Sequence, residues 1–132
     1  MEDKMTVVML NPGEESKITQ IGTKLEDLQK GVGGGYIEAI YPFRDNACII
    51  CNDEGKFNGM RPNRTLYGEG KEIIDVIYGP FFICGKEEDR FTSLSPELAA
   101  KYAEKFRVPE RVMTLGGRAT MVPCRSEPTL ER

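Results

Sequence analysis

The sequence predicts an α+β fold in which a largely antiparallel sheet of four to six strands carries two helices on one face. Three observations lead to this prediction. Short apolar and β-branched runs recur along the chain, turn-forming residues separate them, and only two segments show helical spacing of apolar side chains. Strands and helices in this order are typical of an α+β domain.

The chain begins with a strand and a short helix. Residues 6–10 are β-branched and apolar, and the turn formers at residues 11–13 close this first strand. Thr23 and Glu26 have the spacing of a capping box, which predicts the start of a helix. Gly31 or Gly33 can take the left-handed conformation that ends a helix, so we expect about two helical turns.

A hairpin and a less regular segment follow. Residues 36–41 and 47–51 are rich in strand formers and are joined by a loop, which predicts an antiparallel pair. Residues 52–55 form a strong turn signal. Pro62 argues against a central strand through residues 61–64, and Gly68, Gly70 and the charged residues between Glu69 and Asp75 predict an exposed loop. We therefore expect this middle segment to be the least regular part of the core.

The second half of the chain contains further strands and the best-supported helix. Residues 73–77 and 81–84 are apolar, and the Gly-Pro pair between them predicts a bulge or an edge kink. Ser95 is a helix cap, and Pro96 suits the first helical position. Apolar residues then recur every four positions, which places one face of this helix on the core.

Beyond Met113 the sequence has too few apolar residues to anchor itself. We therefore predict a single domain over residues 1–113 and an irregular C-terminal tail or arm over residues 114–132. Such an arm either moves freely or packs on a partner.

The composition limits the classes of function. A chain of 132 residues with a formal charge of −3 fits one soluble domain without a positive field for a phosphate backbone, so nucleic-acid binding is disfavoured. No signal peptide or membrane segment is visible, and four cysteines fit a reducing cytoplasm. Because the chain has no histidine, Ser-His and Cys-His nucleophile pairs are excluded.

Five polar residues are candidates for ligand binding. Glu38 lies inside a strand, where an acid must face solvent, a cleft or a partner cation. Asn52 and Glu54 lie in the following turn. Asn63 and Arg64 follow a proline-fixed backbone and can offer an amide and a planar guanidinium to a phosphate, a base or a carboxylate. If the strand acid and this pair lie on one side of the sheet, they form a recognition site.

Structural roles stay open for each of these residues. Glu38 can pair with an arginine or simply be exposed, an acid in a turn is usually solvated, and Asn63 and Arg64 can fix their own loop by hydrogen bonds.

No cofactor or metal site is expected. Cys48 and Cys51 are three residues apart on a strand, where their side chains point to opposite faces, so we expect buried structural thiols. The glycines at residues 31–35 follow a helix rather than precede one, which favours helix termination over anion binding.

Several short motifs follow one another in a fixed order and spacing. They lie at residues 11–13, 25–29, 32–34, 36–38, 52–56, 62–64, 78–83 and 93–95. In these motifs the chain, from Met5 to about Val112, resembles the family of small phage- and plasmid-encoded proteins known as domain of unknown function 3846. The chain departs from the family pattern in a third glycine, Gly35, and in the tail after Met113.

The resemblance implies a mobile-element context, in which related domains also occur in large proteins delivered against host defences. It implies no reaction and no ligand. Our leading hypothesis is therefore a non-enzymatic accessory protein of a phage or other mobile element, in the host cytoplasm, that binds a host protein or a small anionic, nucleotide-like ligand and counters host defence.

Two other classes of function stay open. The first is a nucleotide-processing enzyme that uses Glu38 with Asp53 or Glu54 as general acid and base or as magnesium ligands. The second is a structural module that forms homo-oligomers through an edge strand or the C-terminal arm.

Overall fold

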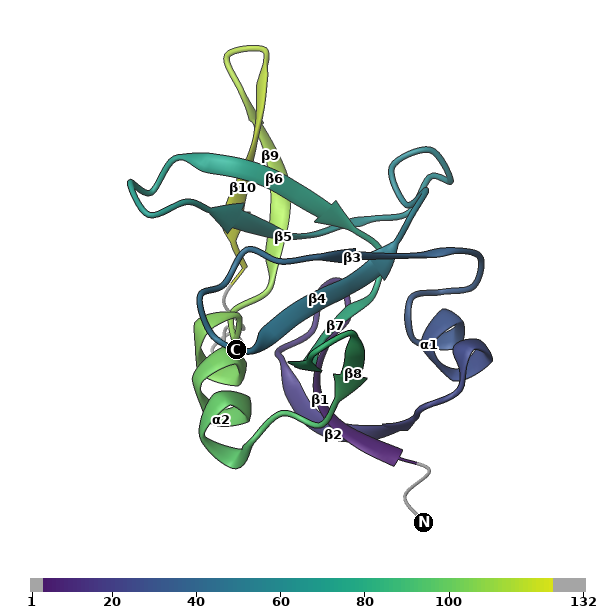
Figure 1. The fold of residues 1–132 in the computed structure, drawn as a ribbon. Helices are drawn as coiled ribbons and strands as arrows, with labels where there is room; N and C mark the ends of the chain where they lie inside the picture. Colours follow the sequence, from purple (N-terminus) through teal and green to yellow (C-terminus); the bar gives the residue numbers. More distant parts are fainter. Residues whose placement is uncertain (1–3, 125–132) are drawn as a thin grey trace, which may run out of the picture.

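The computed structural model describes residues 4–124, and an antiparallel sheet of six strands forms its centre (Figure 1). The strand order is β2-β1-β7-β4-β3, and β8 pairs with the end of β7. These strands are β1 (Lys4–Leu10), β2 (Lys17–Gly22), β3 (Ile37–Ile40), β4 (Ala47–Asn52), β7 (Phe81–Glu87) and β8 (Arg90–Thr92). The predicted α+β class and antiparallel sheet are confirmed, and residues 36–41 and 47–51 pair as predicted.

Two helices and two separate hairpins complete the described chain. The helices are α1 (Leu25–Gly31) and α2 (Pro96–Lys105). The hairpins consist of β5 (Pro62–Tyr67) with β6 (Ile73–Tyr78), and of β9 (Glu110–Leu115) with β10 (Arg118–Pro123).

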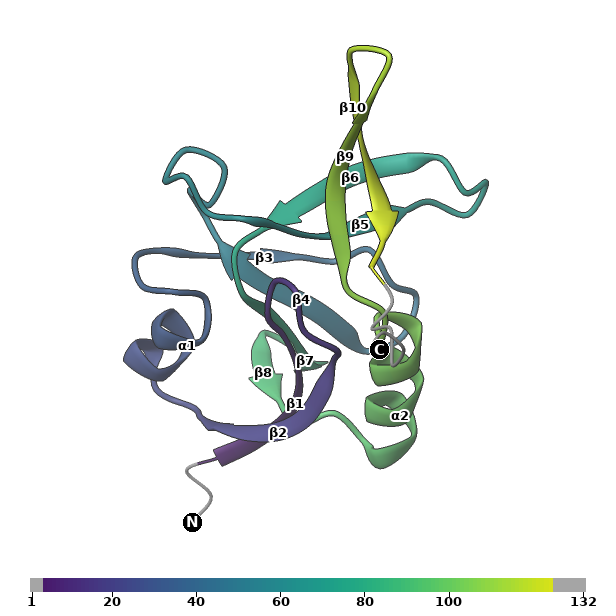
Figure 2. The same ribbon diagram turned by 180° about the vertical axis from the view of Figure 1, so that it is seen from behind.

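The helices cover opposite faces of the sheet, so the prediction that both lie on one face is wrong. Leu28 of α1 packs with Val7 and Met9 of β1, whereas Tyr102 of α2 belongs to the cluster that contains Val8. Consecutive residues of a strand point to opposite faces, so these two clusters lie on the two sides of the sheet. Figures 1 and 2 show α1 and α2 on either side of β1 and β4. The central strands are apolar on both faces, and both faces therefore need a cover.

The middle segment is more regular than predicted. Pro62 is the first residue of β5, a position where its missing N–H removes no necessary bond of the hairpin. Residues 63–66 are buried, and Leu66 of β5 and Ile77 of β6 join the core cluster beneath α2. The β5–β6 hairpin therefore covers part of the same face as α2, and the exposed loop predicted around Gly68 and Gly70 lies between these two strands.

The helix boundaries follow local capping. Ser95 caps α2 as predicted, because its Oγ accepts a hydrogen bond from the Leu98 backbone N–H at 3.2 Å. The start of α1 lies one residue later than predicted. Lys24 is its N-cap, and the Lys24 N–H donates to the Asp27 carboxylate at 3.2 Å.

The C-terminal segment forms a hairpin where an irregular tail was expected. Strands β9 and β10 pair over residues 110–123, and the predicted boundary after Met113 falls within β9. The hairpin extends away from the rest of the protein in both views (Figures 1 and 2). The base of the hairpin is tied to β5, since the Thr65 N–H and hydroxyl donate to the Glu110 carboxylate at 3.0 and 2.7 Å. The rest of the predicted arm, residues 125–132, lies outside the described residues.

Candidate functional site

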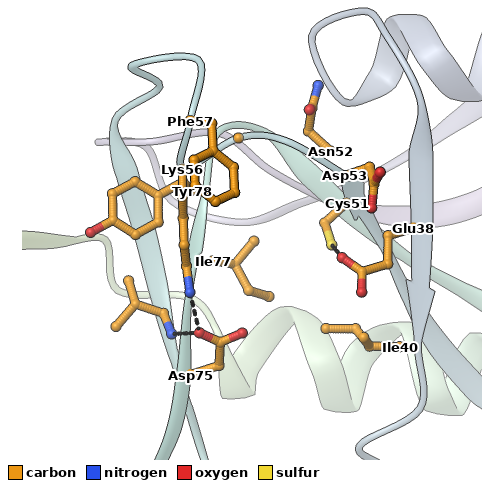
Figure 3. Close-up of a pocket in the computed structure, with 12 residues that line it drawn as sticks. Glu38, Ile40, Cys51, Asn52, Asp53, Lys56, Phe57, Asp75, Ile77 and Tyr78 are labelled. Carbon is orange, nitrogen blue, oxygen red and sulfur yellow. Dashed lines mark hydrogen bonds and ion pairs between the residues drawn. The ribbon is translucent and has the colours of Figure 1, made fainter.

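A cleft of about 210 Å³ opens between β3 and β4 of the main sheet and β6 of the neighbouring hairpin (Figure 3). Within residues 4–124, β3 pairs only with β4 and β6 pairs only with β5, so both are edge strands of the described sheets. The cleft therefore lies between two sheet edges. Its lining consists of Glu38, Ile40, Cys51, Asn52, Asp53, Gly55, Lys56, Phe57, Asp75, Val76, Ile77 and Tyr78.

The inner part of the cleft is apolar. Cys51 and Ile77 are buried members of the core cluster beneath α2, and Ile40 packs against the same cluster. Glu38 and Ile40 alternate along β3 and point to one face, as do Ile49 and Cys51 along β4. The inner wall of the cleft is therefore a continuation of the hydrophobic core, which gives it a fixed shape.

Carboxylates surround this apolar wall. Glu38 and Asp53 lie on one side and Asp75 lies on the other (Figure 3). Among the residues that the structure describes, Lys56 is the only cationic side chain in the lining, and its Nζ donates to Asp75 Oδ1 at 2.8 Å. One ammonium therefore faces three carboxylates, and the cleft has an excess of negative charge.

Asp75 has a second contact that affects the edge of β6. Its Oδ1 also accepts the backbone N–H of Val76 at 2.8 Å. The carboxylate thus occupies an edge donor of β6 that another strand would otherwise bind, a known way to protect an edge strand.

Cys51 is not a nucleophile in this cleft. Burial, with the nearby carboxylates of Glu38, Asp75 and Asp53, raises the pKa of the Cys51 thiol to about 12. Its Sγ lies 4.0 Å from Glu38 Oε1, which accepts the S–H group. The thiol is therefore protonated at neutral pH, and it contributes an apolar surface rather than thiolate chemistry.

Two aromatic side chains line the end of the cleft next to Lys56. Phe57 is 88% exposed, and the Tyr78 ring centroid lies 6.0 Å from Lys56 Nζ (Figure 3). The hydrogen bond to Asp75 raises the pKa of Lys56, so this ammonium stays charged in the physiological range. An exposed phenylalanine beside an apolar cleft offers contact area that the protein itself does not use.

Of the five predicted binding residues, Glu38 and Asn52 line the cleft. The Asn52 side chain is occupied by its own loop, because its amide donates to the carbonyls of Val32 and Gly34 at 3.0 and 2.6 Å. Its oxygen accepts the Glu54 N–H at 2.9 Å. Asn52 thus fixes the cleft wall, and Glu54 is not part of the lining.

Asn63 and Arg64 do not share a surface with Glu38, so the single recognition site expected from the sequence is not formed. Both side chains are fully buried. The Asn63 amide donates to the carbonyls of Leu10 and Gly79, each at 2.9 Å.

The Arg64 guanidinium is bound entirely within the protein. It donates to the carbonyls of Phe106 and Glu14 at 3.0 and 2.8 Å, and to Asn63 Oδ1 at 2.8 Å. Phe106 is the C-cap of α2, where a cation is favoured by the helix dipole. Burial lowers the pKa of Arg64. Asn63 and Arg64 therefore connect β5 to the C-terminal end of α2 and to the turn after β1, and their role is structural.

The sequence did not identify Lys56, Phe57, Asp75 or Tyr78 as site residues. Asp75 gives the clearest signal, since it is an acid within the apolar run of residues 73–77 and, like Glu38, must face solvent, a cleft or a cation. Lys56 and Phe57 carry no such signal, because they follow a turn and only the packing of β6 on β4 brings them to the cleft.

Two further observations concern the described part of the chain. Within residues 4–124, no three His, Cys, Asp or Glu side chains are grouped so that they could hold a metal ion. None of the helices described here is long and apolar enough to span a membrane.

Comparisons with known proteins place the chain in a family. Neither the curated proteins nor the solved structures contain a match. A family profile matches residues 5–107, which include every strand and helix described above except the β9–β10 hairpin. The chain therefore belongs to the family described as Domain of unknown function (DUF3846).

Proposed function

We propose that this protein is a non-enzymatic binding module and that the cleft between β3, β4 and β6 recognises a segment of a partner protein. The observation that carries the proposal is the excess of carboxylates around an apolar wall. Such a cleft suits an apolar side chain flanked by an arginine or lysine, because the carboxylates attract the cation while the wall covers the apolar group.

The same charges favour one of the two classes of ligand expected from the sequence. A nucleotide-like anion would meet Glu38, Asp53 and Asp75, and the one cation that the described residues offer there, Lys56, already binds Asp75. Repulsion by the unpaired carboxylates opposes such a ligand. A host protein is therefore the partner that we propose, and the resemblance to phage- and plasmid-encoded proteins makes a role against host defence the biological context of the proposal.

Affinity capture tests this function. The full-length protein is immobilised and exposed to bacterial lysate beside two charge-reversal variants, Glu38→Lys in the cleft and Glu87→Lys at the exposed end of β7. The proposal expects a protein enriched by the wild type and by Glu87→Lys, and lost with Glu38→Lys. Equal capture by all three proteins, or capture of nothing by the wild type, would contradict it.

An enzyme is the second candidate, because Glu38 and Asp53 both line the cleft. These acids are two of the three residues that the sequence suggested for nucleotide processing, whereas Glu54 lies outside the lining. Incubation of the protein with nucleoside triphosphates and Mg²⁺ tests this candidate. Turnover that disappears with Glu38→Gln would support an enzyme, and no turnover by wild-type protein would count against it.

A further inference from the structure

The β9–β10 hairpin exposes surface that no other described part of the chain covers. Strand β9 packs on β5, and near the base of the hairpin the Glu110 carboxylate accepts two hydrogen bonds from Thr65. Met113, Met121 and Val122 are half-buried, whereas residues 114–120 around the tip are exposed. At the tip, a side-chain carbon built on Gly116 or Gly117 would meet no atom within 4 Å.

The tip of the hairpin presents one apolar and one cationic side chain together. Gly116 and Gly117 have φ angles of +57° and +81°, as the twist of a tight hairpin turn requires. Leu115 and Arg118 flank this turn and are directly paired in the register, so their side chains leave the same face of the hairpin. Leu115 is 64% exposed, and Arg118 is exposed as well.

This pair matches the cleft in both shape and charge. The apolar wall of the cleft, which includes Ile40 and Ile77, suits a leucine, and Glu38 on the β3 side suits an arginine. A space of about 210 Å³ accommodates one or two side chains of this size rather than a folded domain. The protruding turn of a hairpin is small enough to enter it.

We propose that the hairpin tip of one molecule occupies the cleft of a second copy of this chain. This inference rests on the proposed function of the cleft as a site for an apolar and cationic segment. The hairpin projects away from the body in both views, so it reaches another molecule more readily than its own cleft (Figures 1 and 2). If each copy donates its tip to the other, two equal contacts close a two-fold dimer.

The contact through one tip is small, so association is weak and depends on concentration. In this arrangement a homodimer also occupies both clefts. The dimer therefore competes with any other partner of the cleft, and self-association regulates access to the binding site.

Charge reversal tests the proposal with full-length protein. Sedimentation equilibrium is measured from micromolar to millimolar concentration for wild type, for Arg118→Glu at the tip, and for Glu38→Lys in the cleft. Each single variant brings like charges together in both contacts of a dimer, and we expect its association to weaken about tenfold or more. Arg111→Glu is the matched control, because Arg111 lies in the same hairpin but is paired with Val122 near its base.

Mixing the two weakened variants gives the decisive result. The glutamate introduced at the tip of one variant meets the lysine introduced in the cleft of the other, and in the second contact the native Arg118 meets the native Glu38. We therefore expect a heterodimer in the mixture at concentrations where neither variant associates alone. Circular dichroism confirms that each variant is folded.

Two outcomes would overturn the proposal. One is a wild-type protein that stays monomeric at every concentration, and the other is dimerisation that Arg118→Glu and Glu38→Lys leave unchanged. Neither outcome affects capture of a host protein by the cleft, so failure of this inference is distinguishable from failure of the proposed function.

Discussion

Replacement of Arg64 by methionine tests whether this buried guanidinium holds the structure together. Arg64 is 0% exposed, and it donates to two backbone carbonyls and to the side-chain oxygen of Asn63. Methionine has a similar length but no donor. Arg64→Met therefore leaves the carbonyls of Phe106 and Glu14 without this partner inside the protein.

The magnitude follows from those bonds. A hydrogen bond from a charged donor contributes about 1.5–3 kcal/mol, and three are lost. The variant also no longer has to bury a charge, which offsets part of the loss, as the lowered pKa of Arg64 indicates. Each buried acceptor left without its donor costs about 1–3 kcal/mol, so we expect a net loss of about 3–5 kcal/mol in the free energy of unfolding. For a domain with a total stability of about 5–15 kcal/mol, this is a large fraction.

Urea denaturation followed by circular dichroism measures this loss. The midpoint should fall while the slope against urea concentration stays the same, because the surface exposed on unfolding hardly changes. Arg61→Met is the matched control, since Arg61 is exposed and its replacement should change the free energy by less than about 0.5 kcal/mol. A loss below about 1 kcal/mol for Arg64→Met would refute the structural role derived from its hydrogen bonds.

Three further predictions concern other parts of the protein. Hydrogen bonds, above all from Lys101, lower the pKa of Asp45 below its ordinary value of 3.8. This carboxylate therefore stabilises the fold above that pH and loses its effect as the pH falls through the lower folded value. Asp45→Asn should lower the free energy of unfolding at pH 7 but not in strong acid. A difference in this free energy between wild type and variant that stays constant across the pH range would contradict the prediction. The half-buried Cys124 should react with a thiol reagent at pH 8 before Cys51, whose pKa of about 12 keeps it protonated, as mass spectrometry of labelled peptides will show. Phe57→Ser should leave the urea midpoint unchanged, because the ring is exposed, but should reduce capture of the partner, and unchanged capture would remove this ring from the site.

The sequence predicted the fold class because the strands and the second helix have strong local signals. Ser95 and Pro96 define the start of α2, and the paired apolar runs define the β3–β4 hairpin. The distribution of the helices over both faces was not predicted. The continuous apolar run at residues 47–51 indicates cover on both faces. In a strand covered on one face, apolar and polar residues alternate, whereas a strand covered on both faces is apolar throughout.

The candidate site was predicted only in part, for a physical reason. The sequence Pro62-Asn63-Arg64 is the same whether its polar side chains bind a ligand or connect two elements of the core. Only the packing of α2 on β5 shows that Arg64 is buried. Glu38 was identified because an acid within a strand needs an exposed or paired environment. Lys56 and Asp75 are far apart in the sequence, and the packing of β6 on β4 brings them together.

The most direct test of the cleft as the recognition site is a nuclear magnetic resonance titration of the full-length protein with the captured partner. Our account predicts that the largest changes in amide chemical shift occur at Glu38, Asp53 and Asp75, while the amide of the buried Arg64 changes little. Changes centred on the opposite edge of the sheet, at β2, with the cleft amides unaffected, would contradict it.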